Sequence, residues 1–191
     1  IIPTRDGLEV LMPCVQAVRQ SVSMHPLEII IIDNASENQA TLDYLAELKA
    51  DDPRVTIIRD DAPFNFAGLN NRAAAATTAP LLCFLNNDTE VISADWLDRL
   101  AAEALRPEIG AVGARLLYPD GRVQHTGVIL GLGGVASHGD AGRPADDPGP
   151  LYRAVASHRP SALTVACLMM RSSIFNRLNG FDATNLAIDF N

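Results

Sequence analysis

Short apolar runs alternate with amphipathic stretches along the first half of the chain. Four of the runs have the length of buried strands, at 1–3, 28–33, 55–59 and 80–86. The stretches between and after them are alanine-rich or carry apolar residues at helical spacing, which predicts helices at about 6–22, 40–49, 68–77 and 93–105. This alternation of strand and helix predicts a parallel sheet with helices on both faces.

The first predicted helix carries two local signals. Asp6 is predicted to begin it, because Glu9 follows three residues later and the two can form a capping box. Pro13 lies inside the helix, where a proline removes one backbone hydrogen bond and can bend the axis. We therefore expect a helix that starts at Asp6 and can kink near Pro13.

The pattern changes after residue 105. Residues 111–117 and 123–130 predict a hairpin around a turn at 119–122. Residues 131–160 are rich in Gly, Pro, Asp and His and predict a long loop, which in a compact domain is usually functional or mobile. An apolar strand at 163–170 and a short helix at 172–178 complete the predicted elements.

Composition narrows the class of protein. The 191 residues are 48% hydrophobic and 20% charged, which suits one globular α/β domain with a core. The net charge of -8 argues against a nucleic-acid-binding surface, which would need a clustered basic patch. No apolar stretch approaches the roughly 20 residues that cross a bilayer. Because the chain opens without Met, we expect it to be a piece of a longer protein.

A polar cluster follows the fourth predicted strand. Asn86, Asn87 and Asp88 come directly after the apolar run 80–85, and ligands of open α/β sheets bind outside the carboxyl ends of strands. Mg²⁺ and Mn²⁺ prefer oxygen ligands and commonly bridge a carboxylate to substrate phosphates. The cluster predicts a metal or diphosphate site with Asp88 as the ligand. The alternative is a polar turn after an edge strand.

Asp33 ends the second predicted strand in the same way. A carboxylate in that position can accept a hydrogen bond from a ribose hydroxyl or a base N–H, and the alternative is a helix cap or turn. Arg72 is a candidate to pair with a phosphate, and Asn70 is a candidate to bind the base or ribose. The alternative for this pair is a loop cap beside a solvated arginine.

Two histidines, His125 and His138, flank a glycine-rich segment. If the long loop covers a substrate, they are candidates for phosphate or sugar contacts, and the alternative is a structural role. The sequence of this segment, residues 131–136, matches the dinucleotide-binding fingerprint G-x-G-x-x-A. It follows a hairpin strand, however, and later glycines stop a helix from opening after it, so we expect a flexible loop.

Several motifs together resemble the inverting family 2 glycosyltransferases, which have the GT-A nucleotide-diphospho-sugar transferase fold. They are Ile1-Ile-Pro-Thr-Arg-Asp6, Ile31-Ile-Asp-Asn-Ala-Ser36 and Asn86-Asn-Asp88. The last stands where the family's Asp-x-Asp metal motif falls, with Asn at its first position. Segments 64–72, 96–97, 110–114, 117–121 and 124–127 look like a rhamnosyltransferase-like branch that works on bacterial surface polysaccharides.

The resemblance implies an α/β GT-A three-layer fold with a mostly parallel central sheet and a C-terminal hairpin and long-loop region, truncated at both ends. It implies one domain over 1–191, with a nucleotide-binding half at 1–105 and an acceptor-side half at 106–191. The implied metal is Mg²⁺ or Mn²⁺ on Asp88. The implied nucleotide contacts are Pro3, Thr4, Arg5, Asp33, Asn70, Arg72 and Asn87, and the implied acceptor or sugar contacts are Thr164, His125 and His138.

The activity implied is transfer of a sugar, with inversion, from a nucleoside diphospho-sugar to a hydroxyl of a carbohydrate or lipid-linked acceptor. A cytoplasmic location is expected, with peripheral association at the inner face of a bacterial membrane. The family's catalytic base is an Asp shortly after a Gly-Phe-Asp segment, here Gly180-Phe-Asp182. That base is expected just after Asn191, with Asp189 as a weaker match, and the fragment alone would then lack the base.

Two other functions remain open from the residues. One is a non-catalytic nucleotide-sugar-binding domain of a larger synthase, which the Asn at position 86 and the missing base keep open. The other is a sugar nucleotidyltransferase. It would need a glycine-rich, basic loop after the first strand, and residues 4–7 supply only one Arg and one Gly.

Overall fold

The computed structural model describes residues 1–188. Its first half alternates strand and helix, as the sequence predicts. The elements are β1 (Ile2–Thr4), α1 (Leu8–Gln20), β2 (Ile29–Asp33), α2 (Gln39–Asp51), β3 (Val55–Arg59), α3 (Phe66–Ala75), β4 (Leu81–Leu85) and α4 (Trp96–Ala104). Strand β2 pairs in parallel with β1 on one side and with β3 on the other.

The second half is built from shorter strands. They are β5 (Ala111–Gly113), β6 (Leu116–Leu117), β7 (Val123–His125), β8 (Val128–Leu130) and β9 (Ala136–His138), followed by a short 3-10 helix, η1 (Pro150–Tyr152). The last elements are β10 (Cys167–Arg171) and α5 (Ser172–Arg177). Strand β10 lies between β4 and β5 and is antiparallel to both.

Two backbone hydrogen bonds join β1 to β4. The amino group of Ile1 donates to the Cys83 carbonyl at 2.8 Å, and the Leu85 N–H donates to the Ile1 carbonyl at 2.9 Å. They link two three-stranded sheets into one strand order, β3-β2-β1-β4-β10-β5. The four strands from the first half are therefore neighbours, and they carry the carboxyl ends at which the sequence predicts a site.

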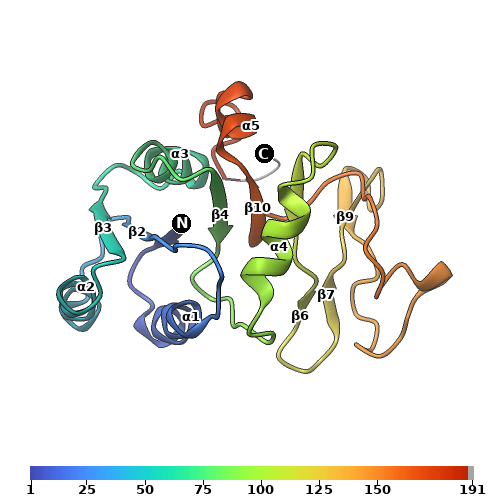
Figure 1. The fold of residues 1–191 in the computed structure, drawn as a ribbon, viewed down its shortest axis with the longest axis horizontal. Coiled ribbons are helices and arrows are strands. Elements are labelled where there is room, and N and C mark those ends of the chain that lie inside the picture. Colours follow the sequence, from blue (N-terminus) through green and yellow to red (C-terminus); the bar gives the residue numbers. More distant parts are fainter. Residues whose placement is uncertain (189–191) are drawn as a thin grey trace.

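The sheet is covered on both faces, which explains why its strands are apolar at consecutive positions. Ile29 and Ile31 pack with the helices α1, α2 and α4, whereas Ile30 and Ile32 pack with α3. Helix α5 covers the α3 side of β4 and β10 through Phe175. Figure 1 shows α3 and α5 on one side of the sheet and α1 and α2 on the other.

The structure corrects the predicted hairpin of 111–117 and 123–130. Strand β5 leaves that hairpin and pairs with β10 instead. Only β6 and β7 form the hairpin around the predicted turn, and β8 pairs with β9, which lies inside the predicted long loop. Within residues 1–188, no helix is long and apolar enough to span a membrane. The division into halves at residue 105 stays a prediction.

Candidate functional site

Three of the predicted nucleotide-binding residues meet at the carboxyl ends of β1, β2 and β4. Thr4 and Asp33 are direct neighbours in the parallel register of β1 and β2. Asn87, in the loop after β4, donates from Nδ2 to the Thr4 hydroxyl at 3.0 Å. Because parallel strands end at the same edge of a sheet, residues from distant parts of the sequence form one surface here.

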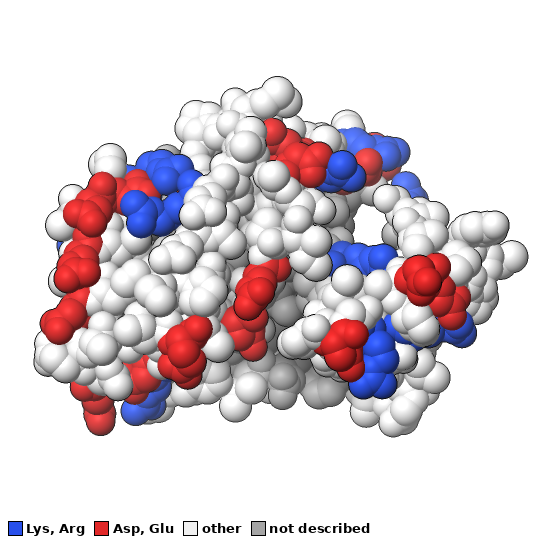
Figure 2. All heavy atoms as spheres, turned by 90° about the horizontal axis from the view of Figure 1, so that it is seen from below, with Lys and Arg blue, Asp and Glu red and all other residues white. Residues whose placement is uncertain are grey.

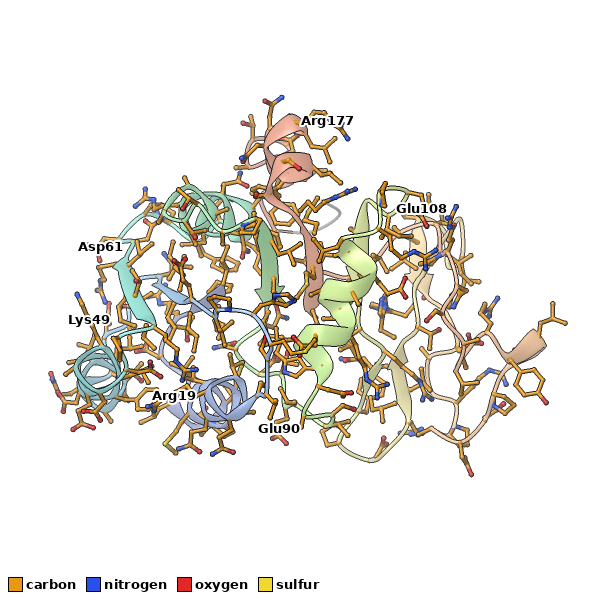
Figure 3. All side chains as sticks on the ribbon, viewed as in Figure 1. Arg19, Lys49, Asp61, Glu90, Glu108 and Arg177 are labelled. Atoms are coloured by element: carbon orange, nitrogen blue, oxygen red, sulfur yellow. The ribbon has the colours of Figure 1, made fainter. Side chains whose placement is uncertain are left out.

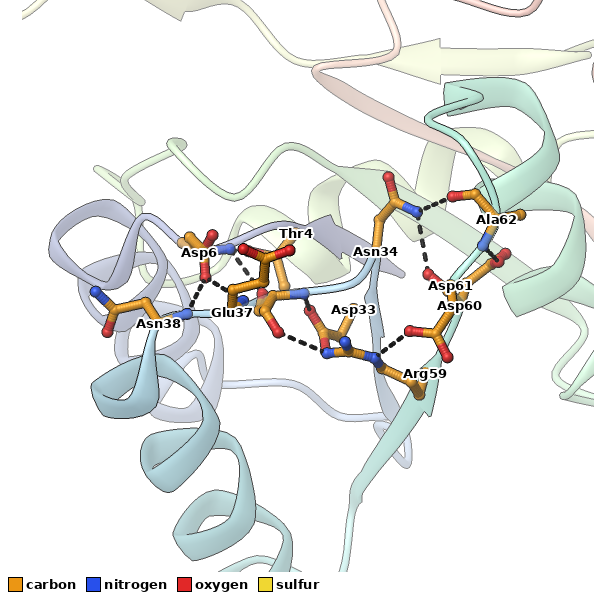
Figure 4. A network of polar contacts seen from close by, with 11 residues as sticks. Thr4, Asp6, Asp33, Asn34, Glu37, Asn38, Arg59, Asp60, Asp61 and Ala62 are labelled. Atoms are coloured by element: carbon orange, nitrogen blue, oxygen red, sulfur yellow. Dashed lines mark hydrogen bonds and ion pairs between the residues drawn. The ribbon is translucent and has the colours of Figure 1, made fainter.

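Asp33 is only 2% exposed, and its carboxylate is held on both oxygens. Oδ1 accepts a hydrogen bond from the Ser36 N–H at 3.1 Å, and Oδ2 forms an ion pair with Arg59. Arg59 also donates to the Ser36 carbonyl at 2.9 Å, so the guanidinium bridges the strand end and the loop after it (Figure 4). These contacts on both oxygens fix the direction of the buried Asp33 carboxylate.

Asp6 does not cap α1, and the predicted capping box is wrong. The residue before the helix is Gly7, which makes no side-chain cap, and Asp6 itself has a φ of 50°. The Asp6 carboxylate instead accepts the N–H groups of Glu37 and Asn38 at 2.9 and 2.8 Å, and its own N–H donates to the Ser36 hydroxyl. Asp6 therefore ties the loop after β1 to the loop after β2 (Figure 4).

Asn34 extends the surface toward β3 and α3. Its Nδ2 donates to the carbonyls of Asp60 and Ala62 at 3.1 and 2.8 Å, while its buried Oδ1 has no hydrogen-bond partner. Arg72 of α3 forms an ion pair with the carboxylate of the same Asp60, at 3.3 Å. A buried acceptor without a donor is costly, and a base N–H is a donor that would satisfy it.

Asp88 lies next to Asn87, is exposed, and forms no hydrogen bond or ion pair with the described residues. No group of three His, Cys, Asp or Glu side chains suited to a metal occurs within residues 1–188. One free carboxylate still fits Mg²⁺ or Mn²⁺, because such ions take most of their ligands from substrate phosphates and water. Glu90 lies two residues further on, beyond the carboxyl end of β4 (Figure 3).

The remaining nucleotide candidates divide into two groups. Arg5 is exposed just after β1 and has no ion-pair partner among residues 1–188, and Pro3 lies within β1, opposite Ile32. Asn70 lies within α3, and its buried Oδ1, like that of Asn34, has no hydrogen-bond partner. Its side chain is fully buried, and Nδ2 donates to the Phe66 carbonyl one turn earlier in α3.

The predicted acceptor residues lie in the second half of the chain. His125 and His138 face each other across β7 and β9, with their Nδ1 atoms 2.7 Å apart. Thr164 is half-buried, and its hydroxyl accepts the Ala166 N–H at 3.3 Å, just before β10. Asp189, the weaker candidate for the base, lies outside the described residues.

Four residues of this surface were not predicted from the sequence to be site residues: Asp6, Asn34, Ser36 and Arg59. Asn34 and Ser36 belong to the same motif as Asp33, Ile31-Ile-Asp-Asn-Ala-Ser36, so that motif was a signal that could have identified them. The acidic residues that follow Arg59 were a further signal, because β3 also ends at this edge of the sheet.

Known structures share this fold. A mannosyltransferase, PcManGT from Pyrobaculum calidifontis, solved with GDP-Man and Mn²⁺, has a TM-score of 0.65 and 16% identity, over 97% of this chain and 47% of that one. GalNAc-T7, solved with UDP, GalNAc and Mn²⁺, has a TM-score of 0.68 and 16% identity, over 99% of this chain and 37% of that one. The fold is therefore that of the GT-A glycosyltransferases.

The sequence itself gives the family. Residues 1–178 match the family described as glycosyl transferase family 2, and the chain belongs to it. It is 41% identical over its whole length to an uncharacterized protein, y4gI, of Sinorhizobium fredii, of which it covers 21%. It is 36% identical over 95% of its length to the O-antigen biosynthesis protein RfbC of Myxococcus xanthus, of which it covers 14%. The chain thus spans about a fifth or less of these curated relatives.

Proposed function

We propose that the chain is the donor-binding region of a metal-dependent, inverting glycosyltransferase that acts in surface polysaccharide synthesis. The observation that carries the proposal is the joint placement of a fixed, buried Asp33 and an exposed, unpartnered Asp88 at one edge of the sheet. The fixed carboxylate of Asp33 is suited to accept hydrogen bonds from a neutral nucleoside. The exposed carboxylate of Asp88 suits a cation that neutralises a diphosphate.

Each residue of the surface has a role in this proposal. The carboxylate of Asp33 accepts a hydrogen bond from the nucleoside, and Asn34 Oδ1 accepts one from the base. Arg5 and Arg72 supply positive charge for phosphate oxygens at the two sides of the surface. Asp88 holds Mg²⁺ or Mn²⁺, which when bound stabilises the charge on the departing nucleoside diphosphate.

The names of similar proteins support this reading of the surface. PcManGT and GalNAc-T7 were both solved with Mn²⁺ and a nucleotide or nucleotide sugar. The relative RfbC is an O-antigen biosynthesis protein, which supports a role in polysaccharide synthesis. Rhamnosyl transfer and location at the inner membrane face stay predictions, as does a carboxylate base just after Asn191 that would deprotonate the acceptor hydroxyl.

A second candidate is a domain that binds nucleotide sugar without transferring it. It is favoured by the single carboxylate at the predicted metal position, where the family motif has two. Both candidates bind the nucleotide sugar at the same surface, formed around Thr4, Asp33, Asn87 and Asp88 and called the donor surface below. They differ in whether the sugar is then transferred. A full-length protein that binds donor with metal, yet neither transfers nor hydrolyses the sugar, would favour the non-catalytic domain.

The test is calorimetric binding of UDP, GDP and dTDP, each with and without Mn²⁺. We expect Mn²⁺ to tighten binding of at least one nucleotide by about tenfold or more, a difference of about 1.4 kcal/mol. Asp88→Asn should remove that gain and leave metal-free binding unchanged. Glu90→Gln is the matched control, since it removes a neighbouring charge. Equal affinities in wild type and Asp88→Asn, with and without Mn²⁺, would refute the proposal.

A further inference from the structure

A cleft of about 590 Å³ lies in the second half of the chain. It opens between β5 and the segments at 125–127 and 153–163. Figure 2 shows the molecule hollowed in this part, with both basic and acidic side chains beside the opening. The donor surface described above uses none of the residues that line this cleft.

A buried polar atom in the cleft wall lacks a partner. His125 lines the cleft and is only 1% exposed, and its Nδ1 is taken by His138. Its other ring nitrogen, Nε2, makes no hydrogen bond. Burial, with smaller contributions from the charges of His138 and His158, lowers the pKa of His125 to about 4. The ring is therefore neutral at pH 7, and Nε2 is a single donor or acceptor that a ligand could satisfy.

The charges around the cleft favour an anion. Glu103 and Glu108 line it, but both are already bonded to Arg106. Arg115 and Arg159 also line it, and neither has a carboxylate partner among residues 1–188. Arg115 donates only to the Ala145 carbonyl, at 2.7 Å. Neither guanidinium group is therefore held in an ion pair, although the charge of Arg159 acts on nearby Glu108.

One backbone segment links the cleft to the donor surface. Val165 lines the cleft, and the next residue, Ala166, binds the loop after β4. The Ala166 carbonyl accepts the Asn86 N–H at 3.0 Å and the Thr89 hydroxyl at 3.5 Å. One backbone segment therefore forms a wall of the cleft and supports the loop that carries Asp88.

We propose that this cleft binds the sugar acceptor, and that the acceptor carries an anionic group. Arg115 and Arg159 hold the anion, and His125 Nε2 binds a hydroxyl of the saccharide. The inference rests on the proposed glycosyltransferase function, whose donor site it complements. The anion is a carboxylate, as on a sugar acid, or a phosphate, as on a phosphorylated saccharide, and both are recognised by guanidinium groups.

The test is calorimetric or NMR-detected binding of three probes, used on the protein saturated with the nucleotide it binds best. They are methyl glucuronide, glucose 1-phosphate and the neutral methyl glucoside. We expect one or both anionic probes to bind at least about fivefold more tightly than the neutral one, since a charge-assisted contact contributes on that scale. Whichever anionic probe binds identifies the source of the charge.

Variants of the cleft residues then test whether the probes bind in the cleft. Arg115→Gln and Arg159→Gln should each weaken the anionic probe about fivefold. Arg122→Gln is the matched control, because Arg122 is an exposed arginine bonded to Asp120 in the hairpin turn. His125→Asn should weaken all three probes. If that variant fails to fold, the two arginine variants still decide the result.

Two results would overturn the inference. One is equal binding of neutral and anionic probes, and the other is unchanged binding in both arginine variants. Nucleotide affinity, measured in the same samples, separates this inference from the proposed function. If nucleotides bind and the saccharides do not, only the acceptor cleft is refuted. If the saccharides bind and no nucleotide does, the donor proposal fails instead.

Discussion

Asn87 and Thr4 are 83 positions apart in the chain, yet the Asn87 side-chain amide donates to the Thr4 hydroxyl at 3.0 Å. The bond joins the loop after β4 to the end of β1, two strands that are neighbours in the sheet. Thr4 is itself the register partner of Asp33. The position of the Asp88 loop is thus coupled to the strand ends that we propose bind the nucleoside.

Replacing Asn87 tests this coupling. Asn87→Ala removes the hydrogen bond to Thr4 and frees the loop, so Asp88 spends less time where a diphosphate-bound ion needs it. We expect about a tenfold loss in nucleotide affinity with Mn²⁺ and little change without it. Calorimetry with the tightest-binding nucleotide measures both. Thr77→Val is the control, since it removes a side-chain hydrogen bond to Glu28 away from this loop. An equal loss with and without Mn²⁺ would disprove the coupling.

Asp33 gives a second prediction, on the nucleoside side. Asp33→Asn keeps the shape but removes the charge that pairs with Arg59, so the nucleotide should bind at least about tenfold more weakly even without metal. Arg59→Met should lower both nucleotide affinity and the melting temperature, because it leaves the buried Asp33 oxygen unpaired. Asp61→Asn is the control: it also removes a partner of Arg59, but Asp61 is 74% exposed, so little should change. Metal-free affinity that is the same in wild type and Asp33→Asn would contradict the assignment.

The meeting of Thr4, Asp33 and Asn87 was predictable from the sequence. Each follows or ends an apolar strand, and the alternation of strands and helices makes those strands parallel. The burial of successive isoleucines in β2 was predictable for the same reason, because both faces of the sheet are covered. These features depend on local pattern and on a general rule of α/β topology.

Other features depend on partners far along the chain, which local pattern does not reveal. Strand β5 was assigned to a hairpin because a turn follows it, but its partner β10 begins only at Cys167. Asp6 has the local signature of a helix cap, yet its carboxylate is used by Glu37 and Asn38. In both cases a tertiary contact overrides the local preference.

Asp52 gives a pH-dependent prediction. It is only 4% exposed and is bonded to Arg54 at 2.8 Å and to Arg19 of α1 at 2.9 Å. The hydrogen bond from Arg54, followed by that from Arg19, holds the pKa of Asp52 well below its ordinary value. A carboxyl with a depressed folded-state pKa stabilises the fold above the unfolded-state pKa, near 4, and loses that contribution as the pH falls further.

Asp52→Asn should therefore lower the free energy of unfolding by about 1–2 kcal/mol at pH 7. The difference from wild type should shrink as the pH is lowered below about 4, because the Asp52 carboxyl of the unfolded wild-type chain then binds a proton, whereas that of the folded chain stays charged to lower pH. Urea denaturation at pH 7, 5 and 3 measures the trend. Asp43→Asn, at an exposed position of α2, is the control. A difference that is constant across this pH range would show that the charge of Asp52 is not its cause.

Substitution of Gly180 gives a prediction that separates the cost of a steric collision from the cost of a left-handed backbone conformation. Its φ is +74°, and a Cβ there would lie 2.5 Å from Oδ1 of Asn71. That same oxygen accepts the Phe181 N–H at 2.9 Å, and Phe181 packs edge-on against Phe84 in the core. Gly180→Ala thus adds a collision to the strain of a left-handed conformation. It also disturbs the turn that leads into the segment where the catalytic base is predicted.

We expect Gly180→Ala to lower the free energy of unfolding by about 2–3 kcal/mol and to reduce transfer by the full-length protein. Gly121→Ala is the matched control. Its φ is +81°, but no atom lies within 4 Å of the added methyl group, so it carries only the conformational cost of about 1 kcal/mol. Urea denaturation of the two variants compares them directly. Equal losses would mean that Asn71 moves aside without cost, and that the turn before Asp182 tolerates a side chain.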